Sequence, residues 1–318
     1  MPGHDTAFPF APEMVRFTAD RRCGLTAAVG FFDGVHAGHR FLFDRVRTEA
    51  ARRGEQSIAV TFAERPKSVL AADRRPYLLT DKAEKLHRLR DCGLDACAWL
   101  HFTPGLAALS AEEFMRRGLY DTLGVRCLVV GYDNRFGNGR SAGFEEYKAY
   151  GEAIGMEVVR AESLKNPGFI VSSSTVREQL AAGRVDEAAA CLGYPYELSG
   201  VIVEGRRVGH DIGFPTANLR PDNPLKIVPA DGAYAVRCRI GGRTYPAMLN
   251  IGRRPTLDNG HDRSIEAHLF DFDGDIYGER MTIIFLHRLR DERKFGSLDE
   301  LRARLQADAD QAKELLGQ

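Results

Sequence analysis

The sequence from Leu25 to His39, Leu-Thr-Ala-Ala-Val-Gly-Phe-Phe-Asp-Gly-Val-His-Ala-Gly-His, decides the fold of the first half of the chain. Its first five residues form an apolar run typical of a buried strand. Gly30, Gly34 and Gly38 allow a tight turn, and the residues after it show a helical pattern with a basic last turn. A strand that enters a helix through a glycine-rich turn is typical of α/β proteins that bind phosphate at the helix N-terminus.

Similar apolar runs alternate with helical patterns along the first half of the chain. Strands are expected at residues 25–29, 57–62, 96–102, 126–130 and 157–159. Helices are expected at residues 41–50 and 81–90, and the capping box Ser110-Ala-Glu-Glu113 marks the start of another. This alternation predicts a parallel α/β sheet.

From residue 200 onward, β-strand signals dominate. Strands are expected at residues 200–203, 233–240, 244–249, 265–270 and 281–286, with Gly241-Gly242 as a hairpin turn. Short helices are expected at residues 175–192, and the capping box Ser297-Leu-Asp-Glu300 opens a C-terminal helix. We therefore expect a small antiparallel β-barrel with a terminal helix. Because 318 residues exceed what one core usually serves, two domains are expected, at residues 1–185 and 186–318.

The composition narrows the class of protein. Lys and Arg balance Asp and Glu at 44 each, so the chain lacks the basic surplus of a protein that binds a nucleic-acid backbone. The six cysteines show no C-x-x-C spacing and are expected to be buried reduced thiols. The sequence has neither a signal-peptide pattern nor an apolar run of membrane-spanning length. We therefore expect a cytoplasmic protein without nucleic-acid or membrane partners.

The first candidate site is the H-x-G-H sequence formed by His36 and His39. Residues three apart in a first helical turn lie on one face, so both imidazoles could stabilise the charge that develops on a phosphate under attack. The alternative is two exposed histidines in a glycine-rich turn. A zinc site is less favoured, because helical zinc ligands usually lie four residues apart and no third ligand is apparent.

The second candidate site is Gly209-His-Asp-Ile-Gly-Phe-Pro-Thr-Ala-Asn218. Gly209 and Gly213 could form a loop that covers phosphates, although no P-loop sequence occurs in the chain. Thr216 and Asn218 lie two apart, so in an extended segment both side chains point to one face. Their hydroxyl and amide oxygens suit Mg²⁺. The alternative is a proline-bounded turn followed by an ordinary strand.

The longer string G-x-F-D-G-x-H-x-G-H resembles the adenylyltransferase half of the bacterial bifunctional riboflavin kinase/FAD synthetase family. The segments that begin at Thr61, Gly131 and Val171 also resemble motifs of this family, although Asn134 stands where the family usually has Phe. The resemblance implies a nucleotidylyltransferase-like domain and the following roles. Nucleotide-binding residues are Gly30, Phe32, Asp33, Gly38, Ser173 and Ser174, catalytic residues are His36, His39 and Arg177, and flavin-binding residues are Phe62, Pro66 and Asp133.

The second half resembles the riboflavin kinase part of the same family. Its matching segments begin at Phe214, Asn250, Ile265 and Leu289. The resemblance implies that Glu266 is the general base that takes the proton of the ribityl hydroxyl. It also implies further roles. Nucleotide-binding residues are Gly209 and Gly213, metal ligands for Mg²⁺ are Thr216 and Asn218, and flavin-binding residues are Arg290 and Phe295.

Both resemblances together imply one enzyme with two ATP-dependent activities, riboflavin phosphorylation and FMN adenylylation. Its substrates would be riboflavin, FMN and ATP. Two alternatives are that only one half is active, or that the chain is a flavin-binding regulator without catalysis. Another nucleotidylyltransferase, acting on pantetheine phosphate or nicotinate nucleotide, would account for the first half but leave the sequence Gly-Phe-Pro-Thr-Ala-Asn218 without a role.

Overall fold

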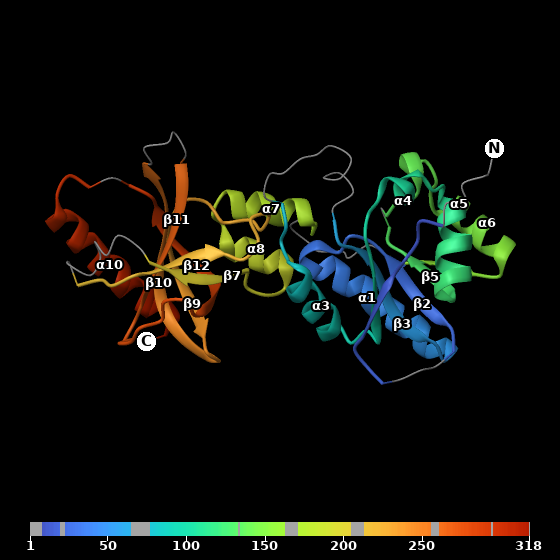
Figure 1. Cartoon of the computed structure of the whole chain (residues 1–318), viewed down its shortest axis with the longest axis horizontal. Coiled ribbons are helices and arrows are strands. Elements are labelled where there is room, and N and C mark those ends of the chain that lie inside the picture. Colours follow the sequence, from blue (N-terminus) through green and yellow to red (C-terminus); the bar gives the residue numbers. More distant parts are fainter. Residues whose placement is uncertain are drawn as a thin grey trace, which may run out of the picture. The chain divides into compact units, whose positions relative to one another are not determined.

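The computed structural model of the chain describes residues 8–19, 23–64, 77–132, 134–162, 171–204, 213–255, 261–293 and 295–317. The chain divides into two compact units (Figure 1). Unit 1 comprises Met1–Arg75 and Thr80–Val171, and unit 2 comprises Pro76–Leu79 and Ser172–Gln318.

Unit 1 contains a six-stranded sheet in the order β1-β4-β3-β2-β5-β6. The strands are β1 (Glu13–Arg16), β2 (Leu25–Val29), β3 (Gln56–Phe62), β4 (Ala96–Leu100), β5 (Val125–Val130) and β6 (Glu157–Arg160). Strands β2 to β6 pair in parallel, whereas the edge strand β1 pairs with β4 antiparallel. The predicted parallel α/β sheet is confirmed, and the edge strand is an addition that the sequence did not indicate.

Helices cover both faces of this sheet. They are η1 (Asp33–Val35), α1 (Ala37–Arg53), α3 (Lys82–Asp91), α4 (Pro104–Ala108), α5 (Ala111–Glu113), η2 (Phe114–Leu123), η3 (Asn138–Arg140) and α6 (Phe144–Ile154). Successive residues of a strand point to opposite faces, so Ala28 joins the core formed with α1 and α3, while Ala27 joins the core formed with η2 and α6. The central strands are therefore buried on both faces, as their continuous apolar sequences require.

The capping box predicted at Ser110 is present, because Ser110 Oγ accepts from the Glu113 amide and Glu113 returns the bond. Its helix continues differently from a regular α-helix. Residues Phe114–Leu123 form a π-helix that ends at Gly124, whose φ of 81° allows the turn into β5. The capping residues in the sequence do not distinguish a π-helix from an α-helix.

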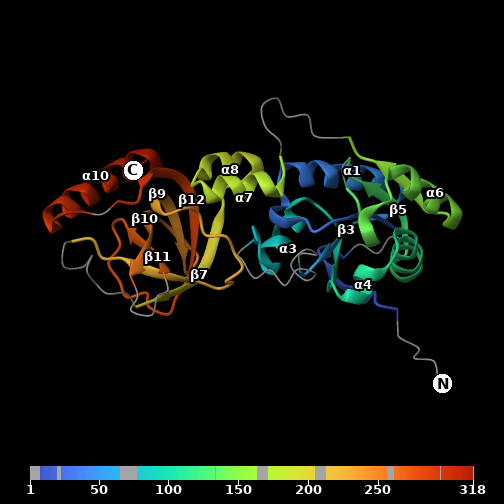
Figure 2. The same ribbon diagram turned by 90° about the horizontal axis from the view of Figure 1, so that it is seen from above.

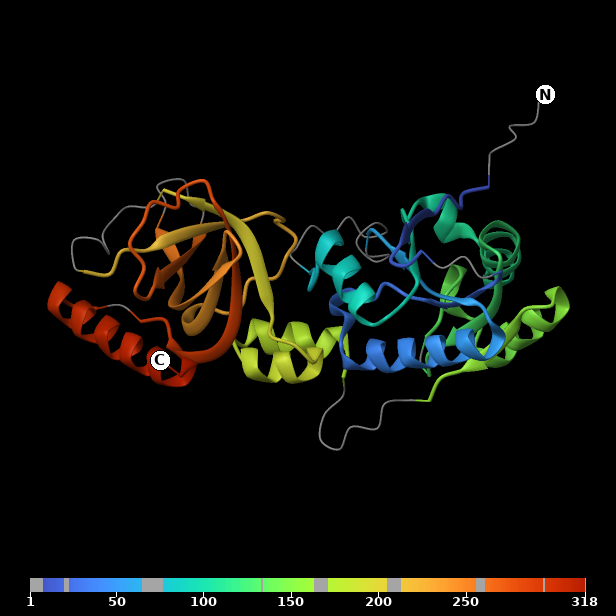
Figure 3. The ribbon, with the colours of Figure 1, turned by 90° about the horizontal axis from the view of Figure 1, so that it is seen from below.

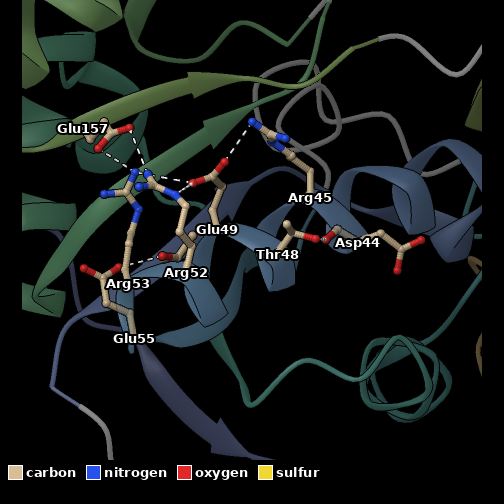
Figure 4. A network of polar contacts seen from close by, with 9 residues as sticks. Asp44, Arg45, Thr48, Glu49, Arg52, Arg53, Glu55 and Glu157 are labelled. Carbon is tan, nitrogen blue, oxygen red and sulfur yellow. Dashed lines mark hydrogen bonds and ion pairs between the residues drawn. The ribbon is translucent and has the colours of Figure 1, made fainter.

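A charged cluster ties the end of α1 to β6 (Figure 4). Glu49 binds Arg45 at 2.8 Å and Arg52 at 3.0 Å, and Arg53 also contacts Glu157. Burial raises the pKa of Glu49, but the Arg52 hydrogen bond and the charges of the three arginines outweigh it, so the net pKa is lowered. The cluster contains none of the predicted site residues and serves packing.

Unit 2 contains a closed barrel in the order β10-β11-β8-β7-β12-β9, with antiparallel pairing (Figure 2). Its strands are β7 (Glu197–Val203), β8 (Ala217–Pro221), β9 (Gly232–Ile240), β10 (Arg243–Pro255), β11 (His261–Leu269) and β12 (Arg280–Asp291). The predicted antiparallel barrel is confirmed. Strand β10 extends beyond the expected residues 244–249, and the short strand β8 coincides with the end of the Gly-Phe-Pro-Thr-Ala-Asn218 sequence.

Within the described part of unit 2, helices pack on the barrel (Figure 3). They are α7 (Ser173–Ala181), α8 (Val185–Leu192) and α10 (Leu298–Leu316). Leu180, Val185 and Leu192 are fully buried in the same core as the inward residues of the barrel. In the structure α7 therefore belongs with the barrel, and the domain boundary expected after residue 185 stays a prediction.

The terminal helix α10 begins as expected at Ser297, whose Oγ accepts from the Glu300 amide at 3.1 Å. The returning bond differs from the predicted capping box, because Glu300 accepts from the Gly296 amide at 3.0 Å. Ala309, Ala312 and Leu316 of α10 then pack on the barrel.

The cysteines follow the prediction only in part. Cys97, Cys127, Cys191 and Cys238 are buried and Cys92 is partly buried. Cys23 is exposed, so the expectation of burial was wrong there, because this residue precedes β2 and lies outside its apolar run. Among the described residues, no helix is both long and apolar enough to cross a membrane.

Candidate active sites

The chain leaves β2 through a strained turn. Phe32 has a φ of 49°, Gly34 a φ of 79° and Val35 a φ of 39°. Such values are rare for residues other than glycine and cost of order 1 kcal/mol each, so surrounding contacts must hold the turn in place.

Asp33 supplies one of these contacts from inside the turn. Its carboxylate is 1% exposed, and Oδ1 accepts from the Thr80 amide at 3.1 Å and from Thr80 Oγ1 at 3.3 Å. Thr80 Oγ1 in turn accepts from the Gly34 amide at 3.1 Å. Asp33 and Thr80 therefore fasten the turn to the residues that precede α3.

The turn places the two imidazoles against each other. His36 is the N-cap of α1, and its Nδ1 accepts from the His39 amide at 3.3 Å. The two rings stack with centroids 3.6 Å apart and an angle of 19° between their planes. The stacking agrees with the prediction that the rings of His36 and His39 lie on the same side. His36 has the extended backbone of a cap (ψ 172°), however, and lies outside the first helical turn.

Two of the motif glycines make room for side chains. A Cβ on Gly30 would lie 2.7 Å from the Phe32 ring, and a Cβ on Gly38 would lie 3.3 Å from the His36 ring. Phe32 is 4% exposed, and its ring packs in T-shaped geometry against the rings of His39 and Phe43. The distances between ring centroids are 5.2 Å and 4.8 Å. These glycines therefore allow aromatic packing behind the histidines, a reason that the sequence did not reveal.

Of the residues expected near the flavin in unit 1, the structure describes Phe62, and it also describes Asn134 after β5. Phe62 ends β3, is 8% exposed and packs against Phe102 at 5.7 Å. Asn134 donates from Nδ2 to the Val29 carbonyl at 2.6 Å, so its amide closes the end of β2. Pro66 and Asp133 lie outside the described residues.

The Ser-Ser-Ser-Thr segment begins α7. Ser172 is the N-cap and accepts from the Thr175 amide at 3.1 Å, which places Ser173 and Ser174 in the first turn. The N-terminus of a helix offers amide donors and a partial positive charge to an anion. Arg177, one turn later, donates from Nε to the Tyr77 carbonyl at 2.7 Å.

Unit 2 has a cavity of about 200 Å³ at one side of the barrel. It gathers four of the predicted site residues, which are Thr216, Glu266, Arg290 and Phe295. Thr216 Oγ1 lies 3.4 Å from Glu266 Oε2. The ladder between β8 and β11 pairs Asn218 directly with Glu266, and Asn218 is 7% exposed. The hydroxyl of Thr216, just before β8, thus lies beside the carboxylate of Glu266 on β11, and strand pairing sets Asn218 opposite the same residue.

Gly213 precedes this cluster and has a φ of 86° with open space around its Cα, so the turn itself requires glycine. Gly209 and His210 lie outside the described residues. Among the described residues, His, Cys, Asp and Glu form no group of three that could hold a metal ion. The oxygen set of Thr216, Asn218 and Glu266 nevertheless suits a hard cation.

Arg290 is held by a buried carboxylate at the cavity wall. Its Nε donates to Asp308 Oδ2 at 2.9 Å and its second terminal nitrogen donates to the same atom at 2.7 Å. Asp308 is 1% exposed and also contacts Arg304 at 2.9 Å. The guanidinium lies 5.7 Å from the centre of the Phe295 ring, which also contacts Arg293. Asp308 therefore orients Arg290 toward the aromatic wall.

His268 also lines the cavity. Its Nδ1 donates to the Pro215 carbonyl at 2.8 Å, just before Thr216. Burial lowers the pKa of His268, the Pro215 bond opposes this, and the charge of Lys313 lowers the pKa further. The sequence indicates this location, because His268 lies two residues after Glu266 on one strand and its side chain therefore points to the same face. Cavity residues that sequence reasoning missed are Phe214, Met248, Asn250, Glu292 and Arg293.

Comparison with known proteins gives two matches to family models. The model for FAD synthetase matches residues 18–175, and the model for riboflavin kinase matches residues 192–316. The first match covers the histidine turn and the second covers the barrel with its cavity. The order of the two matches is the order expected from the motifs.

Whole-chain relatives carry both parts. The bifunctional riboflavin kinase/FMN adenylyltransferase of Escherichia coli K12 is 36% identical over 297 residues, covering 92% of this chain and 93% of its own. The protein of the same description from Bacillus subtilis is 33% identical, covering 90% of each chain. A crystal structure described as a macrolide-efflux protein from Streptococcus pneumoniae has a TM-score of 0.83 and 31% identity, covering 94% of this chain and 97% of that chain.

Proposed function

This chain belongs to the bifunctional riboflavin kinase/FMN adenylyltransferase family, and from that premise we propose how its residues divide the two reactions. The riboflavin kinase domain transfers the γ-phosphate of ATP to riboflavin, which gives FMN and ADP. The FAD synthetase domain joins FMN to the AMP part of a second ATP and releases pyrophosphate. The observation that carries the proposal is that a carboxylate–hydroxyl cluster and an imidazole pair lie in separate compact units.

In the kinase reaction, Glu266 would accept the proton of the ribityl 5′-hydroxyl. The hydroxyl oxygen then attacks the γ-phosphorus, and the bond from that phosphorus to the oxygen of ADP breaks. The cavity beside Glu266 supports this role, because it has an apolar and aromatic wall at Met248 and Phe295. The flavin would lie against this wall, with Arg290 fixed by Asp308 as the contact at its edge.

Thr216 and Asn218 would hold Mg²⁺ through their side-chain oxygens. Their chemistry supports this assignment, as does the position of Thr216 and Asn218, just before and on β8, beside Glu266 of β11. The bound ion would neutralise charge on the phosphates of ATP. Gly213, and with it Gly209, would form the loop over these phosphates.

The metal assignment predicts that Thr216→Val lowers the rate of FMN formation and raises the Mg²⁺ concentration needed for half-maximal rate. Thr244→Val is the matched control, because Thr244 is exposed on β10. Kinase rates measured over a Mg²⁺ titration check this. An unchanged Mg²⁺ dependence in the Thr216 variant would remove this residue from the metal site.

In the adenylylation reaction, a phosphate oxygen of FMN attacks the α-phosphorus of ATP, and pyrophosphate leaves. No covalent enzyme intermediate is needed, so the protein contributes positioning and charge stabilisation. His36 and His39 would stabilise the negative charge that develops on the phosphate oxygens. Asp33, being buried against Thr80, would act by holding the turn.

The remaining roles are predictions from the family motifs. Gly30 and Phe32 would support the nucleotide site by packing, and Gly38 by leaving room for the His36 ring. Ser173, Ser174 and Arg177 would bind phosphate oxygens of ATP, which the helix N-terminus at α7 supports. Phe62, Pro66 and Asp133 would contact the flavin of FMN. The cytoplasm is the proposed compartment.

Incubation of the chain with riboflavin and Mg-ATP, followed by chromatography of the products, tests the proposal. FMN should appear first and FAD later, with ADP and pyrophosphate as the other products. Formation of FMN alone would leave only the kinase half active. Binding of riboflavin without either product would favour the flavin-binding regulator.

A further inference from the structure

Lys85 is a buried lysine that the two reactions described above do not use. It lies on α3, its side chain is 1% exposed, and its ammonium faces the carboxyl end of the unit 1 sheet. Lysine is almost never fully buried unless it is paired or has a function, so this position needs a reason.

The ammonium of Lys85 joins the ends of two parallel strands. Nζ donates to the Phe31 carbonyl at 2.8 Å, just after β2, and to the Phe62 carbonyl at 3.4 Å, at the end of β3. The Phe31 carbonyl also accepts from Thr61 Oγ1 at 3.0 Å. Two donors therefore fix the peptide group at which the chain leaves the sheet.

This peptide group directly precedes the strained turn. Phe32, the next residue, has the positive φ and packs against His39, while Asp33 is fastened by Thr80. Thr80 lies just before α3 and Lys85 in its first turns, so this segment holds the strained turn at two points. A charged donor makes a hydrogen bond roughly twice as strong as a neutral one.

We infer that Lys85 is a positioning residue for adenylyl transfer, whose buried ammonium fixes the Phe31 carbonyl and thereby holds the turn that presents His36 and His39. This inference rests on the proposed role of the histidines. Lys85 acts through the turn and is not placed in contact with a substrate.

The surroundings of Lys85 make its charge measurable. Burial lowers the pKa of Lys85 to about 8, while the carboxylate of Asp33 opposes this shift. The other titratable group that faces it, the thiol of Cys97 on β4, has its pKa raised to about 12 by burial and stays neutral near pH 8. The lysine therefore changes charge in a range where the Cys97 thiol does not.

Trp99, the only tryptophan of the chain, reports on this charge. Its ring is 3% exposed, and the Lys85 ammonium lies 5.1 Å from the ring centre. Lys82 lies 5.2 Å from the same ring but is exposed and paired with Glu13 at 2.7 Å. Lys82→Gln is thus a matched control, since it removes a cation near Trp99 without touching the turn.

The experiment measures FMN-to-FAD rates and Trp99 fluorescence for the full-length wild type, Lys85→Met and Lys82→Gln on either side of about pH 8. In the wild type, the adenylylation rate should fall as the pH rises through this value, and Trp99 emission should change with the same midpoint. Lys85→Met should lower kcat by about 10- to 100-fold, the effect of losing one charged hydrogen bond. Lys82→Gln should keep the wild-type rate and both transitions.

Both transitions should be absent in Lys85→Met, and riboflavin phosphorylation should keep its normal rate. A wild-type adenylylation rate in this variant, or persistence of the pH transition, overturns the inference. If the variant does not fold, the wild type alone tests the inference. The inference is overturned if the pH midpoints of its adenylylation rate and of its Trp99 emission do not coincide. A wild-type chain that makes no FAD from FMN overturns the proposed function and this inference together.

Discussion

The two candidate sites position their side chains in different ways. In unit 1, a turn with positive φ at Phe32 and Val35 presents the histidines, and buried contacts from Thr80 and Lys85 hold that turn. In unit 2, the pairing of β8 with β11 sets Asn218 beside Glu266 with ordinary strand geometry. One site depends on a strained backbone with external supports, and the other depends on strand register.

This difference has a consequence for substitutions. A strained turn has competing conformations close in free energy, so removing a distant support should reduce activity. Strand register is fixed by many ladder bonds along the barrel, so only the reacting side chains should matter strongly there. Substitutions of supporting residues should therefore affect adenylylation more than phosphorylation.

The largest effect is expected for Glu266→Gln. The amide keeps the size of the side chain but cannot accept the hydroxyl proton, so FMN formation should fall by about 10²–10⁴-fold. Conversion of supplied FMN to FAD should stay near normal. Glu279→Gln, at an exposed position before β12, is the control. Equal loss of both activities in the Glu266 variant would refute separate sites.

His36→Ala should have the reverse effect. Loss of one donor to the phosphate should reduce adenylylation by roughly 10²–10³-fold and leave the kinase rate unchanged. His87→Ala is the control, because His87 is exposed on α3. Steady-state rates of both reactions measure this, and full adenylylation by the His36 variant would exclude the residue from the mechanism.

A smaller effect is expected for Gly30→Ala. The added Cβ would lie 2.7 Å from the Phe32 ring, so this ring and the adjoining His39 must shift. Displacement of a catalytic group by a fraction of an ångström should lower adenylylation by about 10-fold. Gly296→Ala, where the nearest atom is 3.6 Å away, should be neutral for that reaction. An unchanged rate in Gly30→Ala would show that the turn tolerates displacement, against the comparison drawn above.

The smallest effects concern stability and pH. Burial lowers the pKa of Lys85 from 10.5 to about 8, so between these values the unfolded chain binds the proton that the folded chain has lost. Stability should therefore rise with pH across that range and lack this gain below about pH 8. The protonated lysine costs about 3 kcal/mol at most.

Lys85→Met should remove this cost and flatten the pH dependence. Denaturant unfolding of unit 1, followed by Trp99 fluorescence at neutral and alkaline pH, measures it. A variant that is less stable than the wild type at neutral pH would show that the hydrogen bonds of Lys85 outweigh the cost of burying its charge.

Much of the architecture could be predicted from the sequence. Apolar runs marked β2 to β5, because strands buried on both faces are continuously hydrophobic. The edge strand β6 was marked by its two adjacent valines. The antiparallel edge strand β1 was not predicted, since its sequence Glu-Met-Val-Arg carries no such run and its two end residues are exposed. The π-helix after Ser110 also gave no signal, because its residues fit an ordinary helix pattern.

Spacing indicated the direction of the candidate side chains only in part. His36 and His39 stack, but His36 is the N-cap of α1 and lies outside its first turn. The shared face expected for Thr216 and Asn218 stays a prediction. Lys85 was missed, because its role depends on carbonyl groups that only the folded sheet brings together. One signal was present, since Lys85 lies four residues before the buried Leu89 and therefore on the inner face of its helix.

The most direct test of two transfer sites is to follow both phosphorus atoms of FAD made from riboflavin. ATP labelled at the γ-phosphorus should label FMN and the FMN part of FAD, and ATP labelled at the α-phosphorus should label only the AMP part of FAD. With His36→Ala, γ-labelled FMN should accumulate, and with Glu266→Gln, supplied FMN should still acquire the α-label. Absence of γ-labelled FMN with His36→Ala, or absence of the α-label from supplied FMN with Glu266→Gln, would contradict two independent sites.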